Sequence, residues 1–283
     1  MIKLVLTDLD DTLIPFDPSG AGHGASSHAC AAIHEALGAG VRVGPVTGRM
    51  PHSMAWMFSG DEACYQTAAF VNGQVVRLDG RTVFERGMTG EELAAIDDVL
   101  EQTDFAYLAL YDEGDVRLVS ADAERVRKNP PPTFGVEMDA IVSEIPAVGC
   151  LKANIQCACD YGRMAELRDE LRDAVPSADF VLPSLVAAVI DVLPGDWGKA
   201  EAVRLLAREL GVGIDEVAVF GDSDNDLAMI EVVPNSVAVA NASDAVRAAA
   251  RWHIGASADG AVAGAISAIA RAARAGEMPE FMR

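Results

Sequence analysis

The sequence predicts an α/β protein with a doubly wound, mostly parallel core and an inserted α+β domain. Short apolar stretches alternate with helix-like stretches near both ends of the 283-residue chain, as strands and helices do in a doubly wound sheet. Between about residues 83 and 190 this alternation gives way to stretches typical of hairpins beside helices. Polar clusters also follow several of the apolar stretches. Ligands of open α/β sheets bind beyond the carboxyl ends of the strands, which is where such clusters would lie.

The first core segment begins with a strand whose near-continuous apolar run indicates burial on both faces. Ser26 or Ser27 can cap the helix that comes next. Asn72-Gly73 is a hairpin signal before the apolar residues that follow it. The pattern predicts, in order, a strand at 2–7, a helix at 27–37, a strand at 41–46, a helix near 51–58 and a strand at 68–71.

The middle segment indicates an α+β module with an antiparallel sheet. It contains a capped helix at 89–102, a hairpin at 105–120, a strand at 151–159, a helix at 162–175 and a strand at 185–193.

The strand–helix alternation then returns to the end of the chain. It predicts a helix at 199–210, a strand at 216–220, a helix at 225–233, a strand at 236–240, a helix at 243–250 and an Ala-rich helix from about Gly260. We therefore expect a core of residues 1–82 and 191–283 and an inserted domain of residues 83–190.

The composition excludes several classes of partner. Lysine and arginine number 22 against 43 aspartates and glutamates, a net charge of −21 that repels nucleic acid and anionic membranes. A phosphorylated substrate would need cations in its own site.

The five cysteines include no Cys-x-x-Cys pair and are expected to be free thiols in a reducing compartment. With no long apolar stretch, we expect a cytoplasmic protein, monomeric or homodimeric.

Three carboxylates directly follow the first strand, where their charges repel one another. These are Asp8, Asp10 and Asp11. A divalent cation would neutralise such a group, and its hard oxygen ligands suit magnesium. Asp222 stands in a second acidic cluster, "GDSDND", after a later strand. Either cluster alone is also compatible with a solvated turn or a helix cap.

Taken together, the polar clusters resemble the haloacid dehalogenase superfamily, and within it the Cof-like phosphatases. Asp8, Asp10 and Thr12 match the family's Asp-x-Asp-x-Thr motif. Thr47 matches the Thr or Ser that ends the next core strand, and Lys199 matches a Lys that opens a helix. The last motif, Gly-Asp-x-x-Asn-Asp, is matched by "GDSDND". The resemblance covers nearly the whole core.

The resemblance implies a Rossmann-like core and a magnesium-dependent phosphatase that acts through an aspartyl-phosphate. It implies that Asp8 is the nucleophile and that Asp10 protonates the leaving group and then activates water. It implies that Mg²⁺ is held by Asp8, the backbone carbonyl of Asp10 and Asp222. The implied substrate contacts are Thr47, Gly48, Lys199 and Asn225, with Thr12 and Asp226 in support.

Arg49 and Asn72 are two further candidate site residues. Arg49 could contact a substrate anion or form a surface ion pair. Asn72 follows its strand at the same sheet edge and could face the site or serve only the turn.

Two departures from the family pattern stand out. Asp11 stands at a position where the family usually has Gly, and "PGDWG" before Lys199 is unusual.

The inserted domain follows the second motif, which is where the Cof-like subfamily carries a large cap. A cap excludes water and contacts the part of the substrate that is not phosphate.

The resemblance leaves several functions open. The substrate is expected to be a small phosphorylated metabolite, such as a sugar phosphate. A phosphosugar mutase, or a phosphatase of the mannosyl-glycerate or sucrose-phosphate type, would use the same core. More distant alternatives are a signalling receiver, which is shorter and lacks a cap, and a non-catalytic phosphate-sensing protein.

Overall fold

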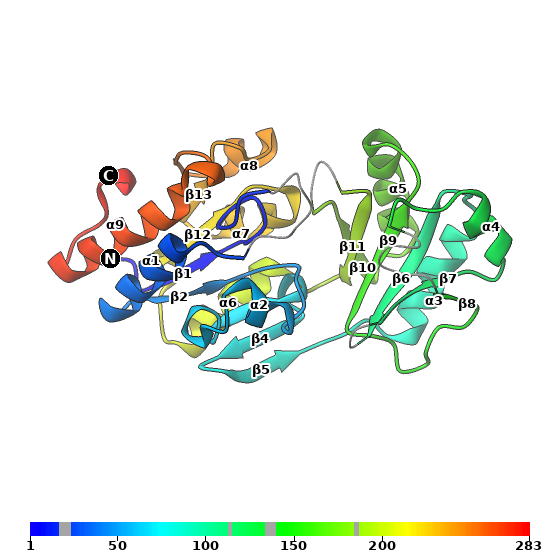
Figure 1. Ribbon diagram of the computed structural model, residues 1–283, viewed down its shortest axis with the longest axis horizontal. Helices are drawn as coiled ribbons and strands as arrows, with labels where there is room; N and C mark the ends of the chain where they lie inside the picture. The colour runs from blue at the N-terminus through cyan, green and yellow to red at the C-terminus, as the bar shows by residue number, and fades with distance from the viewer. Residues whose placement is uncertain (17–23, 113–114, 134–139, 184–186) are drawn as a thin grey trace. The chain divides into compact units, whose positions relative to one another are not determined.

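The computed structural model describes residues 1–16, 24–112, 115–133, 140–183 and 187–283. The chain forms two compact units, residues 1–85 with 198–283 and residues 86–197 (Figure 1). The second boundary therefore lies beyond residue 190, the position expected from the sequence. Strand β11 (Val189–Pro194) pairs with two strands of the second unit and belongs wholly to it. Among the described residues, no helix is both long and apolar enough to cross a bilayer.

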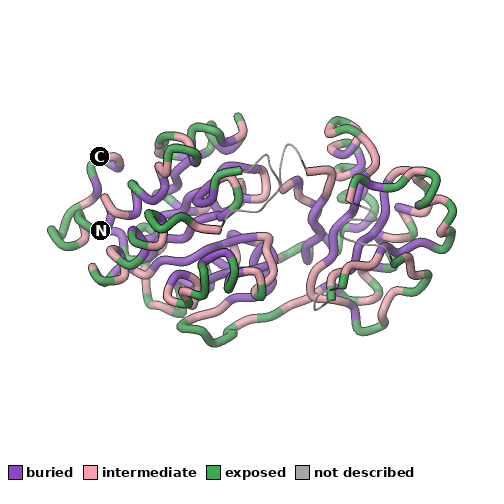
Figure 2. The backbone as a smooth tube through the Cα atoms, in the orientation of Figure 1, coloured by how far each residue is buried: buried purple, intermediate pink, exposed green. Residues whose placement is uncertain are grey.

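The first unit is built on a parallel sheet of five strands in the order β14-β13-β12-β1-β2. Strand β1 therefore has β2 on one side and β12 on the other, so the sheet is wound in both directions from its first strand. The strands are β1 (Leu4–Thr7), β2 (Arg42–Pro45), β12 (Val217–Gly221), β13 (Asn235–Ala238) and β14 (Trp252–His253). Figure 2 shows the central strands as buried, in agreement with their apolar sequences.

Helix α1 of this unit packs against α9, and α7 packs against both α6 and α8. Ser26 is the residue that caps α1, because its hydroxyl accepts a hydrogen bond from the backbone N–H of Ala29 (3.1 Å). The helices are α1 (Ser27–Gly38), α2 (Ser53–Met57), α6 (Lys199–Glu209), α7 (Leu227–Val232), α8 (Asp244–Ala249) and α9 (Ala261–Ala275).

The third predicted core strand lies in a separate small sheet and not in the parallel core sheet. Strand β3 (Ala68–Phe70) pairs antiparallel with β4 (Val75–Leu78), which pairs with β5 (Arg81–Glu85). A single parallel bridge, between Val46 and Ala69, links this small sheet to the end of β2. The turn at Val71–Gly73 is too short for a crossover, so the chain folds back as the hairpin that Asn72-Gly73 predicts.

The second unit is a six-stranded mixed sheet in the order β10-β11-β9-β6-β7-β8, antiparallel except between β7 and β8. The predicted hairpin at 105–120 is present as β6 and β7, although residues 113–114 at its turn lie outside the described residues. The first residues of the strand predicted at 185–193 also lie outside them. The remaining strands are β6 (Ala106–Asp112), β7 (Asp115–Val119), β8 (Ala140–Val142), β9 (Lys152–Cys157) and β10 (Ala178–Val181).

Helices α3 (Gly90–Leu100) and α5 (Tyr161–Ala174) share one apolar core with this sheet. Alternate residues of β6 and β9 enter that core, as the two-residue period of a strand requires. The short helix α4 (Ala123–Lys128) packs through Val126 against Tyr107 in a second, smaller cluster. The unit therefore has a core of its own, as the change of pattern in the sequence predicts.

Candidate active site

Strand pairing brings the two acidic clusters of the sequence together. Strands β1 and β12 are parallel neighbours, and the backbone N–H of Asp8 donates to the carbonyl of Phe220 (2.9 Å). Asp8 and Asp222 each follow the end of one of these strands. Carboxylate oxygens of Asp8, Asp222 and Asp226 all lie within 4.8 Å of one another, and all three side chains are buried. We call these three residues the carboxylate cluster.

Lys199 joins the carboxylate cluster from the first turn of α6. Its Nζ donates to Asp8 Oδ1 (2.7 Å) and to Asp226 Oδ1 (2.6 Å), and its side chain is 1% exposed. Burial alone would lower the pKa of Lys199, but attraction to the two carboxylates outweighs it and raises that pKa. The lysine is therefore a buried ammonium ion whose position depends on its partners.

One ammonium ion does not balance three carboxylates. Burial, together with repulsion from Asp226 and Asp222, raises the pKa of Asp8 well above its usual value despite the opposing attraction of Lys199. Burial and repulsion from Asp226 likewise raise the pKa of Asp222 to about 7. With all three carboxylates ionised and Lys199 protonated, the site carries two uncompensated negative charges, which a divalent cation would neutralise. The donors are hard oxygen atoms, so these residues fit a magnesium-like ion.

Asp222 makes the stability of the metal-free protein depend on pH. Its pKa is about 7 when folded and about 3.9 when unfolded, so the folded chain holds more protons between these values. The contribution of Asp222 to the free energy of unfolding therefore falls as pH rises from about 4 to about 7. We expect metal-free Asp222→Asn to melt at a higher temperature than the wild type at pH 8. The two melting temperatures should converge towards pH 4.

The same variant should lose its response to metal. Adding Mg²⁺ at pH 8 should raise the melting temperature of the wild type and leave that of Asp222→Asn almost unchanged. Equal stabilisation of both proteins by Mg²⁺ would show that the carboxylate cluster is not the site of binding.

Asp226 holds the loop that carries Asp222. Its Oδ2 accepts hydrogen bonds from the backbone N–H groups of Asp222 (2.9 Å) and Ser223 (3.2 Å). A Cβ atom on Gly221 would lie 2.6 Å from the Cβ of Asp226, so only glycine fits there. The sequence pattern assigns Asp226 a supporting role, and the structure also places its carboxylate within the cluster. The alternate acidic residues in "GDSDND" are the sequence feature that could have indicated this position of Asp226.

The loop after β1 is fixed by polar contacts to the second acidic segment and to the segment after β13. Thr12 is buried, and its hydroxyl donates to Asp222 Oδ1 (2.6 Å). Asn241 donates from its side chain to the carbonyl of Asp11 (2.8 Å). Asn241 was not singled out from the sequence, although it follows an apolar strand, β13, as the other site residues follow theirs.

Asp11 stands where the family usually has glycine, and its backbone shows why. Its φ angle is 62°, in the left-handed region that glycine adopts without strain. Aspartate tolerates this region better than most residues, and Asp11 Oδ1 accepts a hydrogen bond from the backbone N–H of Phe16 (3.2 Å). The substitution thus keeps the turn.

Asp10 lies outside the carboxylate cluster. Its carboxylate receives two hydrogen bonds from Arg49, one from Nε (2.8 Å) and one from Nη2 (2.6 Å). Both side chains are about half exposed, at 51% for Asp10 and 42% for Arg49. The ion pair considered for Arg49 from the sequence is therefore present, and its partner is the predicted acid–base residue.

Thr47 and Asn225 are connected through Asn72. The backbone N–H of Asn72 donates to the carbonyl of Thr47 (2.8 Å), and Asn225 Nδ2 donates to Asn72 Oδ1 (3.3 Å). Thr47 itself accepts a hydrogen bond at Oγ1 from the backbone N–H of Arg49 (3.1 Å), with Gly48 between them in the turn. Both Thr47 and Asn72 are buried. Asn72 therefore links the end of β2 to the second acidic loop.

Gly73 allows the hairpin turn to approach the start of α6. Its φ angle is +102°, and a Cβ atom there would lie 2.6 Å from the carbonyl oxygen of Gly198, next to Lys199.

Gly80 also has a positive φ (+78°), but a Cβ atom there would meet nothing within 4 Å. Gly80→Ala should lose about 1–2 kcal/mol of unfolding free energy through left-handed strain alone. Gly73→Ala should lose clearly more in urea denaturation, and equal losses would refute the close approach.

Comparison with known proteins identifies the family and supports the fold. The family model of the haloacid dehalogenase-like hydrolases matches residues 5–266. Because that match covers most of the chain, the protein belongs to the haloacid dehalogenase-like hydrolases.

Solved structures of this superfamily share the fold at low sequence identity. A phosphatase of the superfamily from Bacteroides thetaiotaomicron, BT1666, superposes with a TM-score of 0.75 at 20% identity, covering 94% of each chain. The subclass IIB sugar phosphatase BT4131 gives a TM-score of 0.70 at 18% identity, covering 93% of this chain and 97% of the other. The superposition with BT4131 agrees with a parallel core sheet and an inserted mixed-sheet cap domain in the present chain.

Two curated relatives resemble this chain over short segments. Both are 5-amino-6-(5-phospho-D-ribitylamino)uracil phosphatases. The one from Bacillus subtilis is 31% identical over 88 residues, covering 31% of this chain and 30% of the relative. The one from Escherichia coli is 39% identical over 66 residues, covering 23% of this chain and 24% of the relative. The chain thus aligns with less than a third of either relative.

Proposed function

We propose that this protein is a magnesium-dependent phosphatase of small phosphorylated metabolites, with Asp8 as the nucleophile. The observation that carries the proposal is the buried pair of Asp8 and Lys199 within a group of three carboxylates. The two relatives named as phosphatases, and the sugar phosphatase of similar fold, support the same class of substrate.

Asp8 would attack phosphorus and form an aspartyl-phosphate, which water then hydrolyses. Lys199 holds Asp8 Oδ1, which orients the second carboxylate oxygen for attack. The lysine also supplies a positive charge beside the transferred phosphoryl group, and phosphoryl transfer depends mainly on such positioning and charge. A bound Mg²⁺ would add positive charge that keeps Asp8 ionised and stabilises the phosphoryl oxygens.

Asp10 would donate a proton to the leaving oxygen and later accept one from the attacking water. Arg49 donates to both oxygens of Asp10 in the structure, so Asp10 would exchange a proton through the lone pairs that these two hydrogen bonds leave open. Thr47 and the backbone N–H of Gly48 would bind phosphoryl oxygens. Asn72 and Asn225 act as positioning residues through their hydrogen bond.

Recognition of the rest of the substrate is proposed for the second unit, residues 86–197. The sheet of that unit carries a polar cluster on the face opposite its main core. Asn154 and Gln156 both donate to the hydroxyl of Tyr111, at 2.9 Å and 3.2 Å. Amides and a phenol can both donate and accept hydrogen bonds, which is the chemistry that selects hydroxyl-rich molecules such as sugars.

The proposal is tested by phosphate release from a panel of phosphorylated sugars, nucleotides and cofactor phosphates. We expect at least one substrate to be hydrolysed with Mg²⁺, with activity lost on chelation and restored by added Mg²⁺. Transfer of the phosphoryl group to a second sugar hydroxyl, with no phosphate release, would indicate a mutase instead. Hydrolysis that continues after chelation would contradict the proposed role of the carboxylate cluster.

A further inference from the structure

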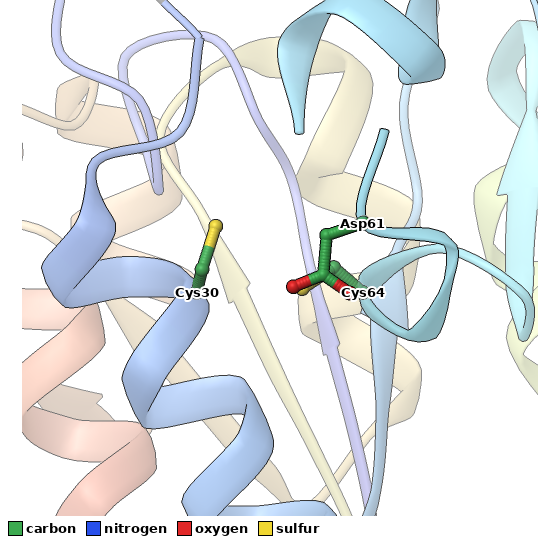
Figure 3. Close-up of side chains that lie close together, drawn as sticks. All are labelled: Cys30, Asp61 and Cys64. Carbon is green, nitrogen blue, oxygen red and sulfur yellow. The ribbon is translucent and has the colours of Figure 1, made fainter. Parts of the chain in front are cut away.

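A second group of metal-ligating side chains lies in the first unit, outside the carboxylate cluster. It consists of Cys30 on α1, with Asp61 and Cys64 at the short 3₁₀ turn η1 (Glu62–Cys64). One ligand atom from each lies within 4.8 Å of the other two. Figure 3 shows Cys30 on the helix facing the neighbouring segment that carries Asp61 and Cys64. We call this group the thiol site.

The backbone around the thiol site is already ordered by secondary structure. Helix α1 packs against η1. The backbone N–H of Cys64 donates to the carbonyl of Asp61 (3.1 Å), so these two residues face the helix from one tight turn. Cys64 is fully buried, while Cys30 and Asp61 are partly exposed, which leaves a path for an ion from solvent.

His34 fixes the carboxylate of the thiol site. It lies one helical turn after Cys30, and its Nε2 is 2.7 Å from Asp61 Oδ2. A histidine on one oxygen of a carboxylate ligand is the kind of outer contact that orients ligands in metal sites. The donors therefore come from two packed elements, and the carboxylate has a partner of its own.

We propose that Cys30, Asp61 and Cys64 bind one zinc ion, with water as the fourth ligand and His34 orienting Asp61. Two sulfur ligands select a thiophilic ion such as Zn²⁺ over Mg²⁺. In a tetrahedral site with Zn–S bonds of about 2.3 Å, two sulfurs lie about 3.8 Å apart, which agrees with the observed clustering. Binding releases the two thiol protons to solvent and leaves two thiolate–zinc bonds, so no oxidant or reductant is needed.

The ion would join α1 to the segment that leads into β3 and the Val71–Gly73 turn. Because that turn contacts the start of α6, the thiol site would stabilise the frame of the active site without taking part in its chemistry. This role differs from that of the carboxylate cluster, whose donors are all oxygen atoms.

The test is titration of the full chain, reduced and stripped of metal, with Co²⁺ and then Zn²⁺ in the presence of excess Mg²⁺. We expect one Co²⁺ per chain with thiolate-to-cobalt charge-transfer absorption, displacement by Zn²⁺, and a higher melting temperature with Zn²⁺. Cys30→Ser and Asp61→Asn should weaken zinc binding at least tenfold. Cys150→Ser, which removes a partly buried thiol of the second unit, should bind as the wild type does.

Cys30→Ser and Asp61→Asn alter partly exposed positions, so both should fold even if a change at the buried Cys64 does not. Absence of the charge-transfer absorption in the wild type would overturn the proposal. Absorption that persists unchanged in both variants would also overturn it. So would peptide mapping that finds Cys30 and Cys64 joined as a disulfide in the protein as isolated.

Discussion

Asp8→Asn should lower phosphate release by at least about 10³-fold, because an amide cannot replace a carboxylate nucleophile. Asparagine is nearly isosteric with aspartate, and its Oδ1 can still accept the hydrogen bond from Lys199. The change also removes one of three mutually repelling buried charges. The fold should therefore survive, as circular dichroism and the melting temperature would show.

The outcome of this variant separates a nucleophile from a metal ligand. A nucleophile is required for every turnover, so added Mg²⁺ should not rescue Asp8→Asn at any concentration. If activity remains within tenfold of the wild type, or returns at high Mg²⁺, Asp8 is not the nucleophile.

Lys199→Met should cost about 3–5 kcal/mol of unfolding free energy, because it leaves buried carboxylates without their ammonium partner. The lysine side chain is 1% exposed and contacts both Asp8 and Asp226. Activity should be lost as well, because the phosphoryl group loses a neighbouring positive charge. Urea denaturation of the metal-free protein measures the first effect, and phosphate release measures the second.

Lys3→Met is the matched control for this prediction. Lys3 also forms an ion pair, with Glu216 at 2.7 Å, but its side chain is 48% exposed. An exposed pair contributes about 1 kcal/mol or less, so Lys3→Met should change stability little. Adding Asp226→Asn to Lys199→Met should recover stability without recovering activity. Equal stability of Lys199→Met and Lys3→Met would contradict the buried charge network.

The meeting of the two acidic segments was implied by the resemblance to the family, and the strand pattern agrees with it. Asp8 and Asp222 each follow an apolar run, and the carboxyl ends of parallel strands lie at one edge of a sheet. The alternation of elements predicts the doubly wound core and the inserted α+β domain. These features depend on local patterns that repeat along the chain, which is why they are visible without coordinates.

Contacts that depend on tertiary register were not predictable in the same way. The ion pair of Asp10 with Arg49 and the position of Asp226 within the carboxylate cluster follow from how loops meet. Asn72-Gly73 predicts the hairpin of β3 with β4, but the left-handed backbone at Val71 was not predictable, because a β-branched residue rarely adopts it.

The thiol site also could not be predicted from the sequence. Cys30 and Cys64 lie far apart in the sequence and form no spacing typical of a zinc motif. Only the packing of α1 against η1 brings them together.

The function proposed for this protein requires that the carboxylate cluster hold a divalent cation beside Lys199. Anomalous diffraction from crystals grown with Mn²⁺ in place of Mg²⁺ locates such an ion. We expect one strong peak at bonding distance, about 2.0–2.2 Å, from carboxylate oxygens of both Asp8 and Asp222. Peaks only at other positions, with the cluster empty at saturating Mn²⁺, would contradict it.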